Sequence, residues 1–143
     1  MYKIIFNQNL RCLYWLQSQT GGFYNKKDTT SIGLEKNQEL IAVFAYNNYY
    51  KHRSVQMHFA GVGRWCIKEF LRIGIAYPFK QLKVAKILGF IDSTNIKSIS
   101  FVNKIGAKLE ASIKDVGKYG DILIYSINKQ QCKIFNRLEN GYK

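Results

Sequence analysis

The segment Asn95-Ile-Lys-Ser98-Ile-Ser-Phe101-Val102-Asn-Lys104-Ile105-Gly106 predicts a short capped helix. Asn95 suits an N-cap, because its side chain accepts a hydrogen bond from a backbone N–H of the first turn. Ile99, Phe101, Val102 and Ile105 recur at helical spacing and form an apolar face. Gly106 permits the left-handed conformation in which helices often end. The segment follows the apolar run 84–91, so we expect a strand, a helix and a stop in succession.

A second strand-to-helix transition lies upstream. Residues 54–60 are β-prone and lead into Gly61-Val62-Gly63, and a helical pattern then runs from about Arg64 to a break near Pro78. The nearly continuous apolar run 84–91 is typical of a strand buried on both faces. Strand, helix and buried strand in this order predict a parallel pair, because a right-handed crossover joins such strands.

The flanking segments predict antiparallel strands and further helices. These segments are a strand over 2–6, a helix over 10–16, strands over 29–34 and 39–46 around the turn 35–38, a polar loop over 47–53, a closing hairpin over 108–116 and 121–127 around the turn 117–120, and a terminal helix over 129–137. We expect one α+β (mixed α/β) domain over 1–143, with a central twisted mixed sheet of about six to seven strands and about four helices.

Composition indicates a globular, cytoplasmic protein. Apolar residues make up 47% of the 143 residues and aromatics 15%, enough for a core of ordinary size. The sequence predicts neither a membrane span nor a signal peptide, since no apolar run reaches the roughly 20 residues that cross a bilayer. The cysteines Cys12, Cys66 and Cys132 are too widely spaced for a zinc site or a disulfide framework. We expect them to be buried or half-buried, and we expect no metal site.

The net charge of +13 favours contact with phosphate groups. Lysines dominate the basic residues and are scattered along the chain, and abundant lysine, isoleucine and asparagine are also expected from an A/T-rich genome. The charge therefore leaves two interpretations open, coding bias and a functional basic surface.

The order of these motifs resembles the GNAT acetyltransferase superfamily. Its members carry a strand, then Asn-x-x-Ala/Ser, then a helix ending in Leu-Gly-Phe, where this chain has Ile105-Gly106-Ala107. The resemblance covers about residues 30–130. The phrase Ala76-Tyr77-Pro78-Phe79-Lys80-Gln81-Leu82 is most similar to the branch of the ribosomal-protein N-terminal acetyltransferases and related phage-borne proteins. The resemblance implies a GNAT-like fold with its parallel pair at the coenzyme cleft, and acetyl-CoA as cosubstrate.

The resemblance also implies the residues that bind the coenzyme. The family pattern Arg/Gln-x-x-Gly-x-Gly/Ala corresponds to His58-Phe59-Ala60-Gly61-Val62-Gly63, a loop whose N–H groups would converge on pyrophosphate at a helix N-terminus. The strands that hold this motif and residues 84–91 should splay apart and expose backbone groups to the pantetheine arm. The implied coenzyme-binding residues are Met57, His58, Phe59, Gly61, Val62, Gly63, Arg64, Asn95, Ser98 and Phe101. The alternative is that Gly61 and Gly63 only make a tight turn.

The acid and base that transfer requires are less evident. Many GNAT enzymes carry a general-acid tyrosine seven residues after the motif asparagine, and Val102 occupies that position here. Ser98, Tyr119 or Tyr125 would have to donate the proton instead. His58 is the favoured base because its ordinary pKa lies near neutrality. Glu35, Glu39 and Asp92 are weaker candidates for the base, and we interpret them as solvated charges. Our catalytic candidates are therefore His58, Ser98 and Tyr125.

We accordingly expect an acetyl-CoA-dependent N-acetyltransferase that acts on a primary amine by direct attack. The acceptor class stays open between a protein N-terminus, a lysine and a small molecule, and the segments 19–28, 47–53 and 117–120 are its candidate binding loops. One alternative is a non-catalytic GNAT-like module that binds a host protein or nucleic acid. Another is an acetyltransferase for an RNA-borne amine such as aminoacyl-tRNA. GNAT-like domains often form homodimers, and the sequence leaves the oligomeric state open.

Overall fold

The computed structural model describes residues 1–132. Its sheet has seven strands in the order β1-β2-β3-β4-β5-β7-β6. The strands are β1 (Tyr2–Ile5), β2 (Thr30–Lys36), β3 (Glu39–Tyr50), β4 (Ser54–Gly61), β5 (Lys86–Asp92), β6 (Lys108–Ile113) and β7 (Ile122–Asn128). The helices in this part of the chain are α1 (Asn9–Thr20), α2 (Lys68–Ala76) and α3 (Ile96–Lys104), with a π-helical turn over Tyr77–Gln81.

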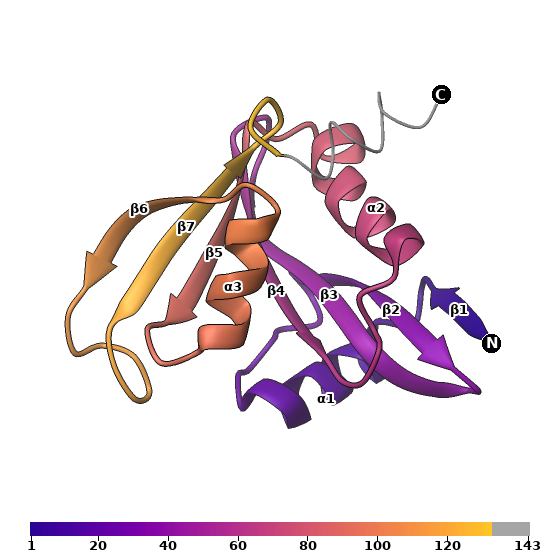
Figure 1. Cartoon of the computed structure of the whole chain (residues 1–143). Coiled ribbons are helices and arrows are strands. Elements are labelled where there is room, and N and C mark those ends of the chain that lie inside the picture. The colour runs from indigo at the N-terminus through magenta and orange to yellow at the C-terminus, as the bar shows by residue number, and fades with distance from the viewer. Residues whose placement is uncertain (133–143) are drawn as a thin grey trace.

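Two antiparallel halves meet at one parallel pair of strands. β1 to β4 form the first half, and β5, β7 and β6 form the second. The halves join where β4 pairs in parallel with β5, at Ser54 with Lys86, Val55 with Ile87 and Gln56 with Leu88. Figure 1 shows the halves diverging away from this junction, with α3 beside β5 and β7. The predicted mixed sheet and its parallel pair are confirmed.

The segment at 95–106 folds as its sequence predicts. The Asn95 side chain accepts a hydrogen bond from the Ser98 backbone N–H at 3.2 Å, which caps α3. Val102 and Ile105 are buried on its apolar face. Gly106 ends the helix with φ of 96°. Local sequence signals were sufficient here because every one of these interactions lies within a few residues of chain.

The helices cover different parts of the sheet. We call the face that α1 covers on β2 to β4 the α1 face, where Leu13 and Leu16 pack against Val43 and Ala45. The opposite face, the α2 face, packs Phe44 against Phe70 with ring centroids 4.8 Å apart. α3 also packs on the α2 face, over Ile91, Leu123 and Tyr125. The α1 face of β5, β7 and β6 carries no helix among the described residues (Figure 1).

Two predicted boundaries and one predicted burial pattern are wrong. β3 continues to Tyr50 through most of the expected polar loop, because its residues still pair with β4. β5 is not buried on both faces, since Phe90 is 45% exposed where no helix covers the α1 face. α2 begins at Lys68 rather than Arg64, because Ile67 has an extended backbone.

Other expectations at the chain ends and at the cysteines are met only in part. The described chain has three α-helices where we expected about four. Residues 129–131 form a turn, and the rest of the predicted terminal helix (133–137) lies outside the described residues. Cys12 and Cys132 are buried as expected, whereas Cys66 is exposed. Within residues 1–132, no helix combines the length and apolarity needed to cross a membrane.

Candidate functional site

A cavity of about 180 Å³ lies where β4 and β5 separate. Beyond Gln56 and Leu88 the two strands no longer pair with each other, so backbone groups along the rest of both edges face the gap. Met57, His58 and Phe59 line the cavity from β4, and residues 87–92 line it from β5. The splayed pair is therefore the feature that creates the site.

The cavity reaches both faces of the sheet. Because side chains alternate along a strand, His58, Leu88 and Phe90 lie on the α1 face, while Met57 and Tyr125 lie on the α2 face. The packing agrees with this alternation, since Met57 and Phe59 join the core beneath α2 and α3. The gap thus connects two sides of the molecule.

A larger groove of about 810 Å³ adjoins the cavity on the side of α3. The two hollows share Thr20, Phe59, Asn95 and Ser98 as lining residues. Phe101 stacks near Phe59 and Trp65, with ring centroids 4.9 and 5.5 Å apart, and all three line the groove. Cavity and groove together form a path from the surface beside α3 into the gap between the strands.

The loop between β4 and α2 differs from the predicted anion loop. The Trp65 indole lies directly over Gly61, where an added Cβ would sit 2.3 Å from the ring. Ile67 is extended and donates its N–H to the Trp65 carbonyl at 2.8 Å, so the helix cannot begin before Lys68. The expectation that Gly61-Val62-Gly63 sits at the helix N-terminus is therefore wrong.

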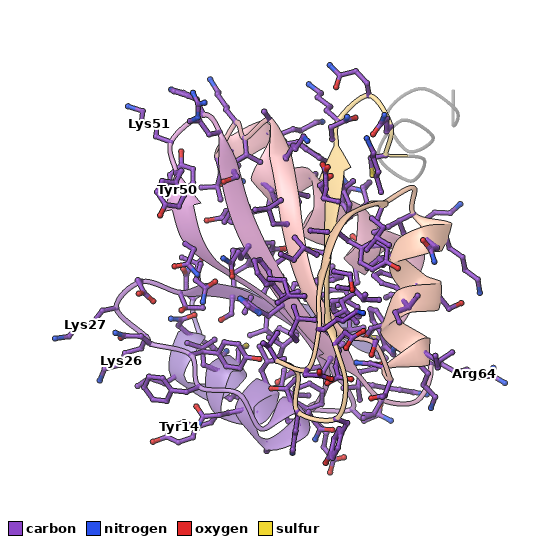
Figure 2. The ribbon with its side chains drawn as sticks, turned by 90° about the vertical axis from the view of Figure 1, so that its left-hand side faces the viewer. Tyr14, Lys26, Lys27, Tyr50, Lys51 and Arg64 are labelled. Carbon is purple, nitrogen blue, oxygen red and sulfur yellow. The ribbon has the colours of Figure 1, made fainter. Side chains whose placement is uncertain are left out.

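The predicted coenzyme-binding residues of this loop have unequal access. The Val62 N–H donates to the Ile41 carbonyl at 2.8 Å, so it is already engaged. The N–H groups of residues 63–66 have no acceptor among the described residues. Gly63 has φ of 62°, in the left-handed region. The Arg64 side chain is exposed and extends away from the body of the protein (Figure 2).

His58 is half-buried and held by two neighbours. Its Nε2 lies 2.8 Å from Asn47 Oδ1, and its ring meets the Tyr24 ring edge-on at 5.2 Å. An amide oxygen only accepts hydrogen bonds, so Nε2 carries the proton and Nδ1 is left as the acceptor. Burial lowers the pKa of His58 below its ordinary value of 6.5. The neutral imidazole is therefore the form favoured at neutral pH.

Tyr125 and Ser98 are the lining residues that carry hydroxyl groups on the α2 face. Tyr125 is 6% exposed, packs in one cluster with Val102, and its hydroxyl has no hydrogen-bond partner in the part of the chain that the structure describes. Ser98 lines both the cavity and the groove. Val102 is buried and lines the cavity with an aliphatic side chain.

The remaining acid and base candidates have other roles. Glu35 is buried and paired with Arg11 rather than solvated, and Glu39 is exposed at the turn between β2 and β3. Neither lines the cavity. Tyr119 is 74% exposed in the loop between β6 and β7. Asp92 lines the cavity, but its oxygens accept hydrogen bonds from the backbone of Tyr119, Gly120 and Thr94 and from the Thr94 hydroxyl.

Asp92 should anchor the β6–β7 loop down to low pH. These hydrogen bonds, with that of Tyr119 first, lower the pKa of Asp92 from 3.8 to about 2. Since the folded pKa lies below the ordinary value, the stabilising effect is fully present above about pH 4 and is lost as pH falls through about 2. We expect the amide proton shifts of Tyr119 and Gly120 to titrate with a midpoint near pH 2. Asp92→Asn should remove the titration, and a midpoint near 4 would contradict the anchoring.

Several residues of the site were not singled out from the sequence. Tyr24 and Asn47 belong to the candidate binding loops 19–28 and 47–53 and contact His58, and Trp65 contacts Gly61. Leu88 and Phe90 line the cavity from β5. An alternating pattern in 86–92 would have revealed Leu88 and Phe90 as a shared face. The contact between Asn47 and His58 depends on the register of β3 against β4, which no local pattern encodes.

No protein-family model and no curated protein matches this chain. Solved structures do resemble it. A variant spermidine/spermine N-acetyltransferase from Vibrio cholerae is 16% identical with a TM-score of 0.73, covering 96% of this chain and 97% of that one. The Vibrio cholerae spermidine N-acetyltransferase in complex with CoA and spermine is 15% identical with a TM-score of 0.69, covering 92% and 96%. Its dodecameric form is also 15% identical, with a TM-score of 0.69.

These likenesses define the class of fold. The chain has the GNAT fold, with a mixed seven-stranded sheet, one splayed parallel pair and α3 beside the gap. At identities this low the comparison establishes the fold alone, so the activity must be argued from the residues that surround the gap.

Proposed function

We propose that this protein transfers the acetyl group of acetyl-CoA to a primary amine. The observation that carries the proposal is the cavity that passes through the splayed sheet, with His58 on one face and Tyr125 on the other. The groove, which lies between α3 and the end of α1, leads into the cavity. A thioester that enters along the groove and an amine that enters from the α1 face would meet in the gap.

The groove fits the coenzyme. The backbone N–H groups of Trp65 and Cys66, which line the groove, have no acceptor among the described residues and could bind phosphate, and Lys104 adds a positive charge to the lining. The aromatic floor at Phe59, Trp65 and Phe101 suits an extended organic arm. Asn95 and Ser98 line the junction of groove and cavity, where the pantetheine end would lie. Coenzyme binding here relies on backbone donors rather than on a helix N-terminus.

His58 is the proposed base. Its free Nδ1 would accept the proton of the attacking amine as the nitrogen bonds to the acetyl carbonyl carbon. Asn47 would hold the imidazole in the tautomer this requires. Backbone N–H groups of β4 near His58 and Phe59 have no strand partner on the β5 side, and one donor toward the carbonyl oxygen is worth about 3 kcal/mol.

Tyr125 is the proposed acid, which would protonate the sulfur as the carbon–sulfur bond breaks. Its position on the α2 face puts it on the side from which the coenzyme would enter. The Tyr125 hydroxyl would take the role of the general-acid tyrosine of other GNAT enzymes, whose position Val102 occupies in this chain. Ser98 is the second candidate for this proton, because it lines the same junction.

The test pairs binding with turnover. Titration calorimetry should show acetyl-CoA binding, and release of free CoA thiol should depend on an added amine. Binding without turnover of any amine would favour the alternative of a non-catalytic binding module. Absence of binding at tens of micromolar would overturn the proposal. Assignment to the ribosomal-protein N-terminal acetyltransferase branch and a homodimeric state remain predictions, as does the cytoplasmic location.

Tyr125→Phe should separate the proposed acid from its alternative. The change keeps the ring that packs against Val102 and removes only the hydroxyl, so we expect kcat to fall about 100-fold with acetyl-CoA affinity unchanged. The pre-steady-state rate of thiol release is the direct measurement. Ser98→Ala is the matched comparison, and a larger loss there than at Tyr125 would assign the proton to Ser98.

A further inference from the structure

Apolar side chains of β5 and β7 lie on the α1 side of the cavity, from which the amine would enter. Leu88 and Phe90 line the cavity on the α1 face of β5, and Ile124 of β7 lies beside Phe90 in the sheet. No helix of the described chain covers this face. We call Leu88, Phe90 and Ile124 the apolar platform. Tyr24 and His58 border the cavity opposite it.

The carboxylates near this entrance are already engaged by neighbouring groups. Asp92 is the acidic residue among the described residues that line the cavity, and its oxygens are occupied by the β6–β7 loop and Thr94. Glu110, also on this side of the sheet, is bound by Lys86 at 2.8 Å and by the Ser126 hydroxyl at 2.6 Å. A cation that entered here would have to compete with Lys86 for Glu110 and with the β6–β7 loop for Asp92.

Lys118 brings a positive charge near the same entrance. Its Nζ lies beside Gly21 at the end of α1, 3.8 Å from where a Cβ would be. Lys26 and Lys27, on the loop that carries Tyr24, extend away from the protein and do not line the cavity (Figure 2). The whole chain has a net charge of +13. A ligand with several ammonium groups would therefore lose solvation and meet repulsion.

We propose that the acceptor is a monoamine attached to an apolar or aromatic body, and that polyamines are poor acceptors. The inference rests on the proposed acetyl transfer. The body of the acceptor lies on the apolar platform, and its single amine points into the gap toward His58. A free arylalkylamine and a peptide N-terminus with an apolar first residue share this chemistry. The Vibrio cholerae protein of similar fold is a spermidine N-acetyltransferase, so spermidine is a suitable acceptor for comparison.

The experiment compares 2-phenylethylamine, a short peptide with N-terminal phenylalanine, and spermidine. With the wild-type protein we expect kcat/KM for at least one apolar amine to exceed that for spermidine at least tenfold. Preference for the peptide over 2-phenylethylamine would identify the source of the amine. Equal or better use of spermidine would overturn the inference, and so would transfer to none of the three while acetyl-CoA still binds. Failure of acetyl-CoA to bind would instead overturn the proposed function.

Two substitutions of Phe90 test whether the apolar platform determines the choice between spermidine and 2-phenylethylamine. Phe90→Glu puts a carboxylate on the platform, and we expect it to raise spermidine use relative to 2-phenylethylamine at least tenfold. Phe90→Ala should lower use of 2-phenylethylamine about tenfold and leave spermidine unchanged. Ile113→Ala, exposed on β6 and away from the cavity, is the control and should keep the wild-type ratio. An unchanged ratio in Phe90→Glu would overturn the role of the platform.

Discussion

Gly61→Ala is expected to weaken acetyl-CoA binding at least tenfold and to lower stability by about 1 to 3 kcal/mol. An added Cβ would lie 2.3 Å from the Trp65 ring, closer than any carbon contact allows. The indole must leave its place over β4, and the loop that carries the free N–H groups of residues 63–66 must move with it. Calorimetry with acetyl-CoA and thermal unfolding measure the two effects.

If the Trp65 ring causes these effects, substitutions at Gly61 and Trp65 should have coupled effects on the free energy of unfolding. In a Trp65→Ala background the added Cβ meets no ring, so Gly61→Ala should cost little further stability, and the double-mutant cycle should give a coupling above 1 kcal/mol. Gly89→Ala is the control for stability, because nothing lies within 4 Å of its Cβ position. Equal effects of Gly61→Ala with and without Trp65 would contradict the packing explanation.

His58→Ala should lower kcat by 10² to 10⁴ while acetyl-CoA affinity changes less than threefold. His58 lines the cavity but does not line the groove, so removal of the ring leaves the groove intact. Burial lowers the pKa of His58, so its neutral form persists below pH 6.5. The acidic limb of kcat/KM should therefore fall off below pH 6.5, and loss of activity already at pH 7 would argue against His58.

Asn47→Asp tests the role of the His58 imidazole without removing the ring. A carboxylate beside Nε2 favours the charged imidazole, so the acidic limb should move to higher pH by about one unit. Asn103→Asp adds the same charge on the exposed side of α3 and serves as the control. An unchanged limb in Asn47→Asp would show that Asn47 does not orient the base.

The candidate site was predicted only in part. His58, Ser98, Asn95 and Tyr125 line one cavity, and their roles in binding and catalysis stay predictions. The distances between these residues across the gap could not be predicted, because they depend on the register and the separation of the strands. The helix start at Arg64 failed for a related reason, since a tryptophan four residues after Gly61 folds back on it through contacts that helical periodicity ignores.

The sequence by itself determined the order of strands and helices, the cap at Asn95 and the stop at Gly106. Those features depend on backbone geometry and contacts within a few residues, which local residue types control. The tertiary structure alone decided where β4 leaves β5, and hence that a cavity crosses the sheet. It also decided that Asn47 meets His58 and that the described carboxylates beside the platform are already bound. These contacts join segments distant in sequence, so only the packed chain specifies them.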